Sequence, residues 1–261
     1  MVLWSGTART HPTRSCLIIS GFPLDWPLWM LAFLVIMGGS FLQGVIGYGV
    51  ALFSAPLLFL IDPVLVPAPL IIVGGILPLL VLASSYRHVV VRDLAYAWPG
   101  GLVGVGLAYG LIRLLPEDTW QVIFGTVIII AVLLSLLSAS LQPGRPLIAG
   151  ASMVAATMGT ITAVGGPPLA LAYQNAQPQR VRGTLSAIFI PLSVMSLAAL
   201  WMLGRFTAAD LVLAAALLPA MVIGFLLSRR VGRRMPARVF RPVMLTVALT
   251  AGAYSVVSGL I

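Results

Sequence analysis

The chain has 261 residues, of which 60% are hydrophobic and 8% are charged, and its mean hydropathy is +1.10. About 25% of the residues in a soluble domain are charged. This composition therefore excludes a soluble domain and indicates an all-α, multi-pass membrane protein. At roughly 20 residues per crossing, the length allows at most about ten membrane segments. The net charge of +9 comes from arginines between hydrophobic segments, so orientation in the lipid bilayer explains it without a nucleic-acid partner.

The first 27 residues are expected to form an N-terminal tail. Their apolar run from Cys16 to Ile19 is too short for the core of a signal peptide, and Pro23 and Pro27 interrupt the residues after it. Cys16 is also the single cysteine of the chain, which excludes an intrachain disulfide and a cysteine-rich metal site.

A broken hydrophobic stretch over residues 28–61 opens a first repeat, which we place at residues 28–141. It divides into an apolar arm of about 15 residues, a break at Gly44–Gly49 and a second arm of about 12, so neither arm reaches the length of a full crossing. Residues 142–146, rich in proline and glycine, then form a linker. Between the broken stretch and the linker, three uninterrupted segments are expected at about 64–84, 94–115 and 120–141.

The second repeat, residues 147–261, follows the same plan. It opens with a broken stretch over residues 147–176, and three uninterrupted segments are expected at about 183–203, 208–228 and 239–260. The matched positions indicate an internal duplication. Gly104, Pro116 and Trp120 match Gly224, Pro236 and Phe240 at one constant offset.

The arginines suggest how the two repeats are oriented. If each broken stretch enters and leaves on one side as a hairpin, each repeat has three crossings and the second repeat is inverted relative to the first. That arrangement puts eleven arginines on one face and four (Arg9, Arg14, Arg113 and Arg205) on the other. The positive-inside rule then makes the arginine-rich face cytoplasmic. If the broken stretches instead crossed the membrane fully, the arginines would be divided more evenly between the two faces. The hairpin arrangement is therefore preferred.

Each break places glycine, proline and neutral polar residues within sequence apolar enough to lie in lipid. An unpaired backbone N–H or C=O group costs several kcal/mol in hydrocarbon, so non-helical backbone there must line a cavity or be buried in protein. One such break in each half is the sequence pattern of a transporter's substrate site. The alternative is that the glycines and prolines only kink the helices and allow close packing.

The second arms are expected to begin near Gly49 and Gly166. A helix N-terminus carries unsatisfied N–H groups and a partial positive charge, so two such ends meeting near the midplane would bind an anion without a cationic side chain. We therefore predict a set of substrate-binding residues from both breaks. They are Gln43, Gly44, Gly47, Tyr48, Gly49, Thr160, Thr162, Gly165, Gly166, Pro167, Tyr173 and Gln174.

Other classes of protein are disfavoured. No Asp, Glu, Lys or Arg falls near the middle of a predicted segment, whereas cation and proton pathways usually carry intramembrane carboxylates. The spacing of His11 and His88 matches no pair of metal ligands. An enzyme would need a motif such as H-E-x-x-H or G-x-S-x-G, and neither occurs. We predict no catalytic residue, no cofactor and no metal site.

The two breaks resemble those of the sulfite exporter TauE/SafE family. Gln43–Gly49 is similar to its glycine-rich Q-G-x-x-G-x-G segment and is followed by Pro56, while Gly165–Pro168 is similar to its G-G-P-P element and is followed by Tyr173. Tyr48 stands where phenylalanine is common in the family. The resemblance covers roughly residues 28–261.

This resemblance implies transport of a small sulfur-containing anion such as sulfite or an organosulfonate. We therefore expect an inverted-repeat secondary transporter, working by alternating access and acting as an exporter, in a bacterial cytoplasmic (inner) membrane. A passive anion channel, or a transporter of another small anion, is the alternative. The sequence leaves the substrate, the coupling ion and the oligomeric state open.

Overall fold

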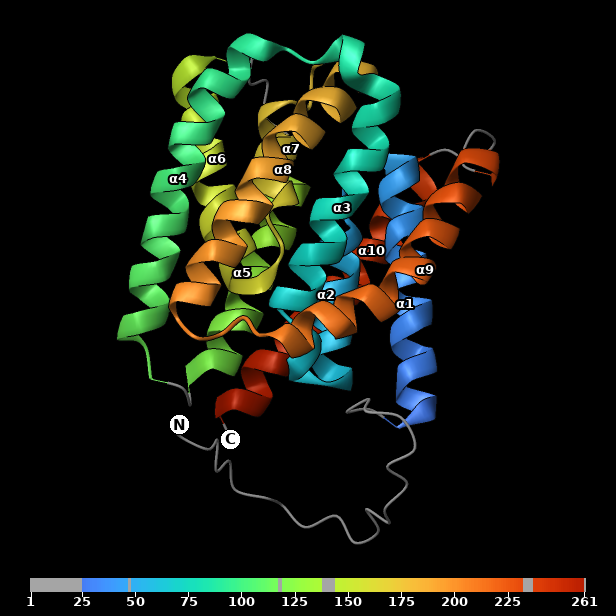
Figure 1. Ribbon diagram of the computed structural model, residues 1–261, viewed down its shortest axis with the longest axis vertical. Helices are drawn as coiled ribbons and strands as arrows, with labels where there is room; N and C mark the ends of the chain where they lie inside the picture. Colours follow the sequence, from blue (N-terminus) through green and yellow to red (C-terminus); the bar gives the residue numbers. More distant parts are fainter. Residues whose placement is uncertain (1–24, 47, 117–118, 138–143, 232–236, 261) are drawn as a thin grey trace, which may run out of the picture.

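The computed structural model describes residues 25–46, 48–116, 119–137, 144–231 and 237–260, and these ranges contain helices and no strand (Figure 1). The expected all-α architecture is therefore confirmed. The first half comprises α1 (Trp26–Ile46), α2 (Val50–Ile61), α3 (Ala68–Ser85), α4 (Val91–Leu114) and α5 (Trp120–Leu136), with short 3-10 turns at Pro63–Leu65 and Tyr86–His88. The second half comprises α6 (Arg145–Thr162), α7 (Gly166–Ala172), α8 (Pro178–Met202), α9 (Ala208–Val231) and α10 (Ala237–Leu260).

Both predicted breaks are present, and each predicted uninterrupted segment corresponds to one helix. The predicted boundaries differ from the observed ones by a few residues: α1 begins at Trp26, inside the expected tail, and α6 begins at Arg145, inside the expected linker. Helix α5 ends at Leu136 rather than near residue 141. The division into two repeats stays a prediction.

The expected length of the first arm is wrong. Helix α1 has 21 residues and continues through Gly38, Gly39 and Gly44, so it is long enough to span a membrane by itself. These glycines do not end the helix because neighbouring helices use them for close approach. A side chain at Gly39 would overlap Ser54 of α2, and one at Gly44 would overlap Ser228 of α9.

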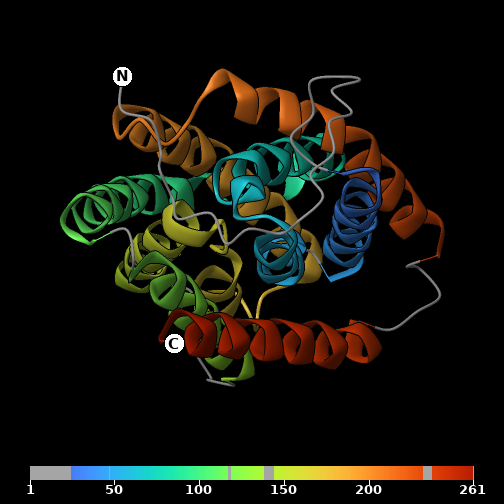
Figure 2. The same ribbon diagram turned by 90° about the horizontal axis from the view of Figure 1, so that it is seen from below.

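Six helical stretches in the described ranges are long and apolar enough to cross a membrane. The 12-residue α2 and the 17-residue α5 are apolar but shorter. In the view from below, α2 lies inside the bundle and α10 runs along its edge (Figure 2). The spans are Trp26–Ile46, Pro63–His88, Val91–Leu114, Pro178–Met202, Ala208–Arg230 and Arg241–Leu260.

The helices of the two halves pack against each other in matching pairs. Helix α1 packs on α9 and α6 on α4, while α3 packs on α8 and α5 on α10. The short helix α2 contacts α10, and α7 contacts α5. Exchanging each helix of the first half with its counterpart in the second reproduces this set of contacts. The four largest interfaces of the bundle therefore each join one helix from each half.

Two of these interfaces depend on one glycine each. A Cβ at Gly104 of α4 would overlap the carbonyl oxygen of Met153 on α6, and a Cβ at Gly224 of α9 would overlap the carbonyl oxygen of Met37 on α1. Residues 104 and 224 are a pair that the sequence matched at the constant offset. The same close approach of helix backbones thus occurs at both members of that pair.

Gly104→Ala should destabilise the protein by about 1–3 kcal/mol, because an added methyl group must push apart two backbones that are already in contact. Thermal unfolding of the purified protein in detergent measures this change. Gly106→Ala is the matched control, since a Cβ at Gly106, on the same helix, would meet no atom within 4 Å. Equal unfolding midpoints for the two variants would contradict the assignment of this contact.

Candidate functional site

The first break reverses the chain between α1 and α2. Gly49, which precedes α2, has a φ of 119°, a conformation that glycine adopts at little cost. The amide oxygen of Gln43 accepts a hydrogen bond from the Val50 backbone N–H at 3.0 Å. Further along, the Ser54 hydroxyl donates to the Val35 carbonyl at 3.2 Å, so α2 runs back antiparallel to α1. Gln43 thereby satisfies one of the N–H groups that the start of a helix leaves unpaired.

The second break is held by a similar set of local contacts. Helix α6 ends at Thr162 and is capped by Ala163, whose φ is 67° and whose N–H donates to the Gly159 carbonyl at 2.8 Å. The Thr162 hydroxyl oxygen accepts from the Val164 N–H at 3.2 Å. A Cβ at Gly165 would lie 2.7 Å from the Ala155 carbonyl oxygen, so the returning chain lies directly against α6. Helix α7 then begins at Gly166.

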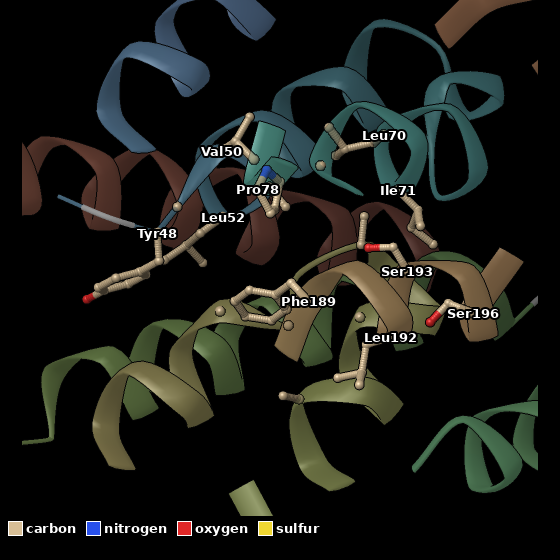
Figure 3. Close-up of a pocket in the computed structure, with 18 of the residues that line it drawn as sticks. Tyr48, Val50, Leu52, Leu70, Ile71, Pro78, Phe189, Leu192, Ser193 and Ser196 are labelled. Carbon is tan, nitrogen blue, oxygen red and sulfur yellow. The ribbon is translucent and has the colours of Figure 1, made fainter. Parts of the chain in front are cut away.

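The two breaks meet at one small cavity, which we call the central cavity (Figure 3). A Cβ added at Gly166 would lie 3.4 Å from the ring of Tyr48, so the two breaks are separated by little more than the space of one methyl group. The cavity has a volume of about 80 Å³. Its walls come from both breaks and from α3 and α8. They include Gln43, Tyr48, Gly49, Gly165, Gly166, Gly74, Pro78, Phe189, Ser193 and Ser196.

The polar groups of the central cavity are neutral. Gln43 is only 8% exposed, and the Val50 bond occupies its amide oxygen, which leaves its NH₂ group as a donor. Ser193 adds a hydroxyl group from α8, and the Ser196 hydroxyl shares a hydrogen bond of 2.8 Å with Thr160. No Asp, Glu, Lys or Arg occurs among the described lining residues. The cavity therefore offers hydrogen-bond donors without a full charge.

A larger cavity of about 480 Å³ lies next to it, and we call it the arginine cavity. It is bounded by the last turns of α1 and α5, by α7, and by the first turns of α8 and α10. Arg182 and Arg241 line it, together with Tyr173 and Gln174. Tyr48 lines both cavities. In Figure 3 its hydroxyl points away from the serines of the central cavity.

The predicted site residues fall into four groups. Gln43, Tyr48, Gly49, Gly165 and Gly166 line the central cavity. Pro167, Tyr173 and Gln174 line the arginine cavity, as Tyr48 also does. Gly44, Thr160 and Thr162 are not among the lining residues of either cavity. Gly47 lies outside the described residues.

The residues that line neither cavity have other contacts. Gly44 packs on Ser228. The Thr160 hydroxyl bonds to the Ala156 carbonyl and to Ser196, and the Thr162 hydroxyl bonds to the Met158 carbonyl. Tyr173, which lines the arginine cavity, also donates to Asp93 at 2.6 Å and so ties the end of α7 to the first turn of α4. These contacts hold the breaks in place.

Sequence reasoning missed two kinds of lining residue. Ser193 and Ser196 lie on the uninterrupted helix α8 and were not considered, although two serines three residues apart in an apolar helix share one face. Arg182 and Arg241 were used to orient the two repeats and were not placed at a cavity. Because they lie in the first turns of α8 and α10, their long side chains reach a cavity that the sequence alone does not show.

The fold and the site thus define a multi-pass helical membrane protein with a small cavity where two helix breaks meet. The chain belongs to the sulfite exporter TauE/SafE family, since the family model described as "Sulfite exporter TauE/SafE" matches residues 31–255. That match includes both breaks and confirms the resemblance. The family is one of membrane transporters of sulfite or related anions and not of enzymes. Neither the curated proteins nor the solved structures contain a significant match.

Gln43→Leu should lower the free energy of unfolding by about 1–3 kcal/mol, because the buried Val50 N–H then loses its acceptor. Thermal unfolding in detergent measures the loss. Gln174→Leu is the control, because that glutamine is exposed and sits beyond the end of α7. An unfolding midpoint for Gln43→Leu equal to that of Gln174→Leu would mean that the bond does not hold the break.

Proposed function

We propose that the protein is a secondary transporter that exports a small sulfur-containing anion, such as sulfite or an organosulfonate, across the bacterial cytoplasmic membrane. The anion binds in the central cavity and is carried by alternating access. The observation that supports this proposal best is the meeting of two helix breaks, one from each half of the chain, at a single cavity. Broken helices that meet inside a bundle are the usual architecture of a transporter's substrate site.

The size of the central cavity favours a small ion. At about 80 Å³ it is far below the roughly 300–1,000 Å³ of a pocket for a drug-sized ligand. A sulfite group fills such a space with oxygen atoms that accept hydrogen bonds. The Gln43 amide from α1 and the Ser193 hydroxyl from α8 can donate to them.

The start of α2 supplies the partial positive charge. Gly49, Val50, Ala51 and Leu52 line the cavity, so the first turn of this 12-residue helix is directed at the bound anion. Helix α7 contributes less, because Pro167 and Pro168 have no N–H groups and remove two donors from its first turn. The anion is therefore held chiefly by the first break, and the second break closes the site from the other side.

Alternating access is supported by the way in which the two halves pack. The matching contacts of α1 with α9 and of α4 with α6 describe two similar interfaces around one site. Rocking about such a pair of interfaces can expose a fixed site to each face in turn. The hairpin arrangement, with an inverted second repeat, would make the two exposed states similar in structure.

Proteoliposomes containing the purified protein should take up labelled sulfite and a simple organosulfonate with saturable kinetics. Sulfate and phosphate, which carry more negative charge than bisulfite or a sulfonate, should compete poorly because no cationic side chain lines the central cavity, and a divalent metal cation because no carboxylate does. Unlabelled substrate on the opposite side should accelerate uptake, as exchange through a carrier does. Flux that does not saturate and shows no such acceleration would favour a passive channel, and absence of sulfur-anion flux would refute the proposal.

Gly166→Val should reduce sulfite flux at least about tenfold, because its side chain would fill the space between the second break and Tyr48. Gly106→Val is the matched control, since that position faces open space on α4 and should leave flux unchanged. Both variants should insert and purify like the unmodified protein. If sulfite flux through Gly166→Val is not reduced, the second break is not part of the anion site.

A further inference from the structure

The arginine cavity is a second feature of the bundle that a small anion could use. Arg182 comes from the first turns of α8 and Arg241 from the first turns of α10, so two segments that are distant in sequence bring two cationic side chains to one cavity. The described lining residues include no Asp or Glu, and the carboxylate bound to the cavity wall, that of Asp93, accepts a hydrogen bond from the Tyr173 hydroxyl. The cavity of about 480 Å³ is also large enough for a hydrated anion.

Both arginines also bind backbone carbonyl groups at the ends of helices. The Arg182 Nη2 atom donates to the Val45 carbonyl at 2.7 Å, in the last turn of α1. The Arg241 Nη2 atom donates to the Ser135 carbonyl, in the last turn of α5. These bonds fix the position of each guanidinium group but use only one of its five N–H donors. The remaining donors and the full charge of each group stay available to an anion.

At the opposite end of the α5–α10 pair, a neutral residue makes the contact between the two helices. The repeat offset of 120 residues makes Gln121 the counterpart of Arg241, and Ser255 the counterpart of Ser135. The Gln121 side chain donates to Ser258 at 2.6 Å, and the Gln121 carbonyl accepts from the Ser255 hydroxyl at 3.0 Å. A neutral residue therefore serves at one end of the pair, whereas an arginine lies at the end that opens into the cavity.

Tyr48 connects the arginine cavity to the site of the first break. Its side chain lines both cavities, and a Cβ added at Gly166 would lie 3.4 Å from its ring. Tyr48 is the wall that the two cavities share, with the arginines in one cavity and Gln43 in the other. An anion that passed from one cavity to the other would therefore move along this ring.

We propose that Arg182 and Arg241 form an entry site, which attracts a small oxyanion from one face of the membrane and delivers it past Tyr48 to the central cavity. This inference rests on the proposed transport function, since it assigns a second anion site on the route to the first. Charge in a cavity with low-dielectric walls raises the local concentration of counter-ions by about tenfold or more. The entry site thereby lowers the half-saturation concentration of the anion on the arginine face only.

The test is labelled-sulfite flux in vesicles of both orientations at low and high ionic strength. For Arg182→Gln/Arg241→Gln, the half-saturation concentration should rise roughly tenfold on one face and stay the same on the other, with an unchanged maximal rate. In the unmodified protein, the lower half-saturation concentration on the arginine face should disappear at high salt, because salt screens the attraction. Arg182→Lys/Arg241→Lys should keep most of this difference between the faces at low salt. Arg230→Gln, which removes a charge from the last turn of α9, is the matched control and should change neither parameter.

Equilibrium binding of labelled sulfite to purified protein separates the two proposals. Gly166→Val should still bind sulfite in a salt-sensitive manner through the arginines, and the double glutamine substitution in the same background should abolish this binding. Unmodified protein that binds sulfite but does not transport it would refute the proposed function alone. Binding or half-saturation values that are the same with and without the two arginines, or that change equally on both faces, would overturn the entry site.

Discussion

The hydrogen bond from Val50 N–H to the Gln43 side chain is the interaction on which the site depends. Within a membrane-embedded bundle, water cannot satisfy the first N–H groups of α2, so the chain must supply an acceptor at the point where it reverses. Gln43 provides that acceptor from the preceding helix at 3.0 Å. The same side chain keeps its NH₂ group for the central cavity. One glutamine thus closes the break and, in the proposed function, also presents a donor to the anion.

Charged side chains are separated from the central cavity. A full charge within the central cavity would bind an anion strongly and slow its release, and the lining residues there are neutral. The arginines lie in the adjacent cavity, where each is anchored to a carbonyl at the end of a helix. In the proposed mechanism, charge acts on the approach of the anion, while neutral donors and the dipole of α2 act on its binding.

The sequence predicted the breaks because glycine, proline and neutral polar residues rarely cluster inside an apolar stretch unless the helix is interrupted there. It placed Gln43, Tyr48, Gly49, Gly165 and Gly166 together, and all five line one cavity. It could not give the length of α1, because whether Gly44 ends a helix or packs on Ser228 depends on a helix from the other half of the chain. For the same reason it missed Ser193 and both arginines, whose roles arise only when α8 and α10 pack against the breaks.

The location of the bound anion tests this account most directly. Selenite has the shape and charge of sulfite, and its selenium atom can be located by anomalous scattering in crystals of the protein. The account predicts a selenium peak in the central cavity, within hydrogen-bonding reach of Gln43 and Ser193, and the loss of that peak in Gly166→Val. A peak elsewhere in the bundle at saturating selenite, with the central cavity empty, would contradict it.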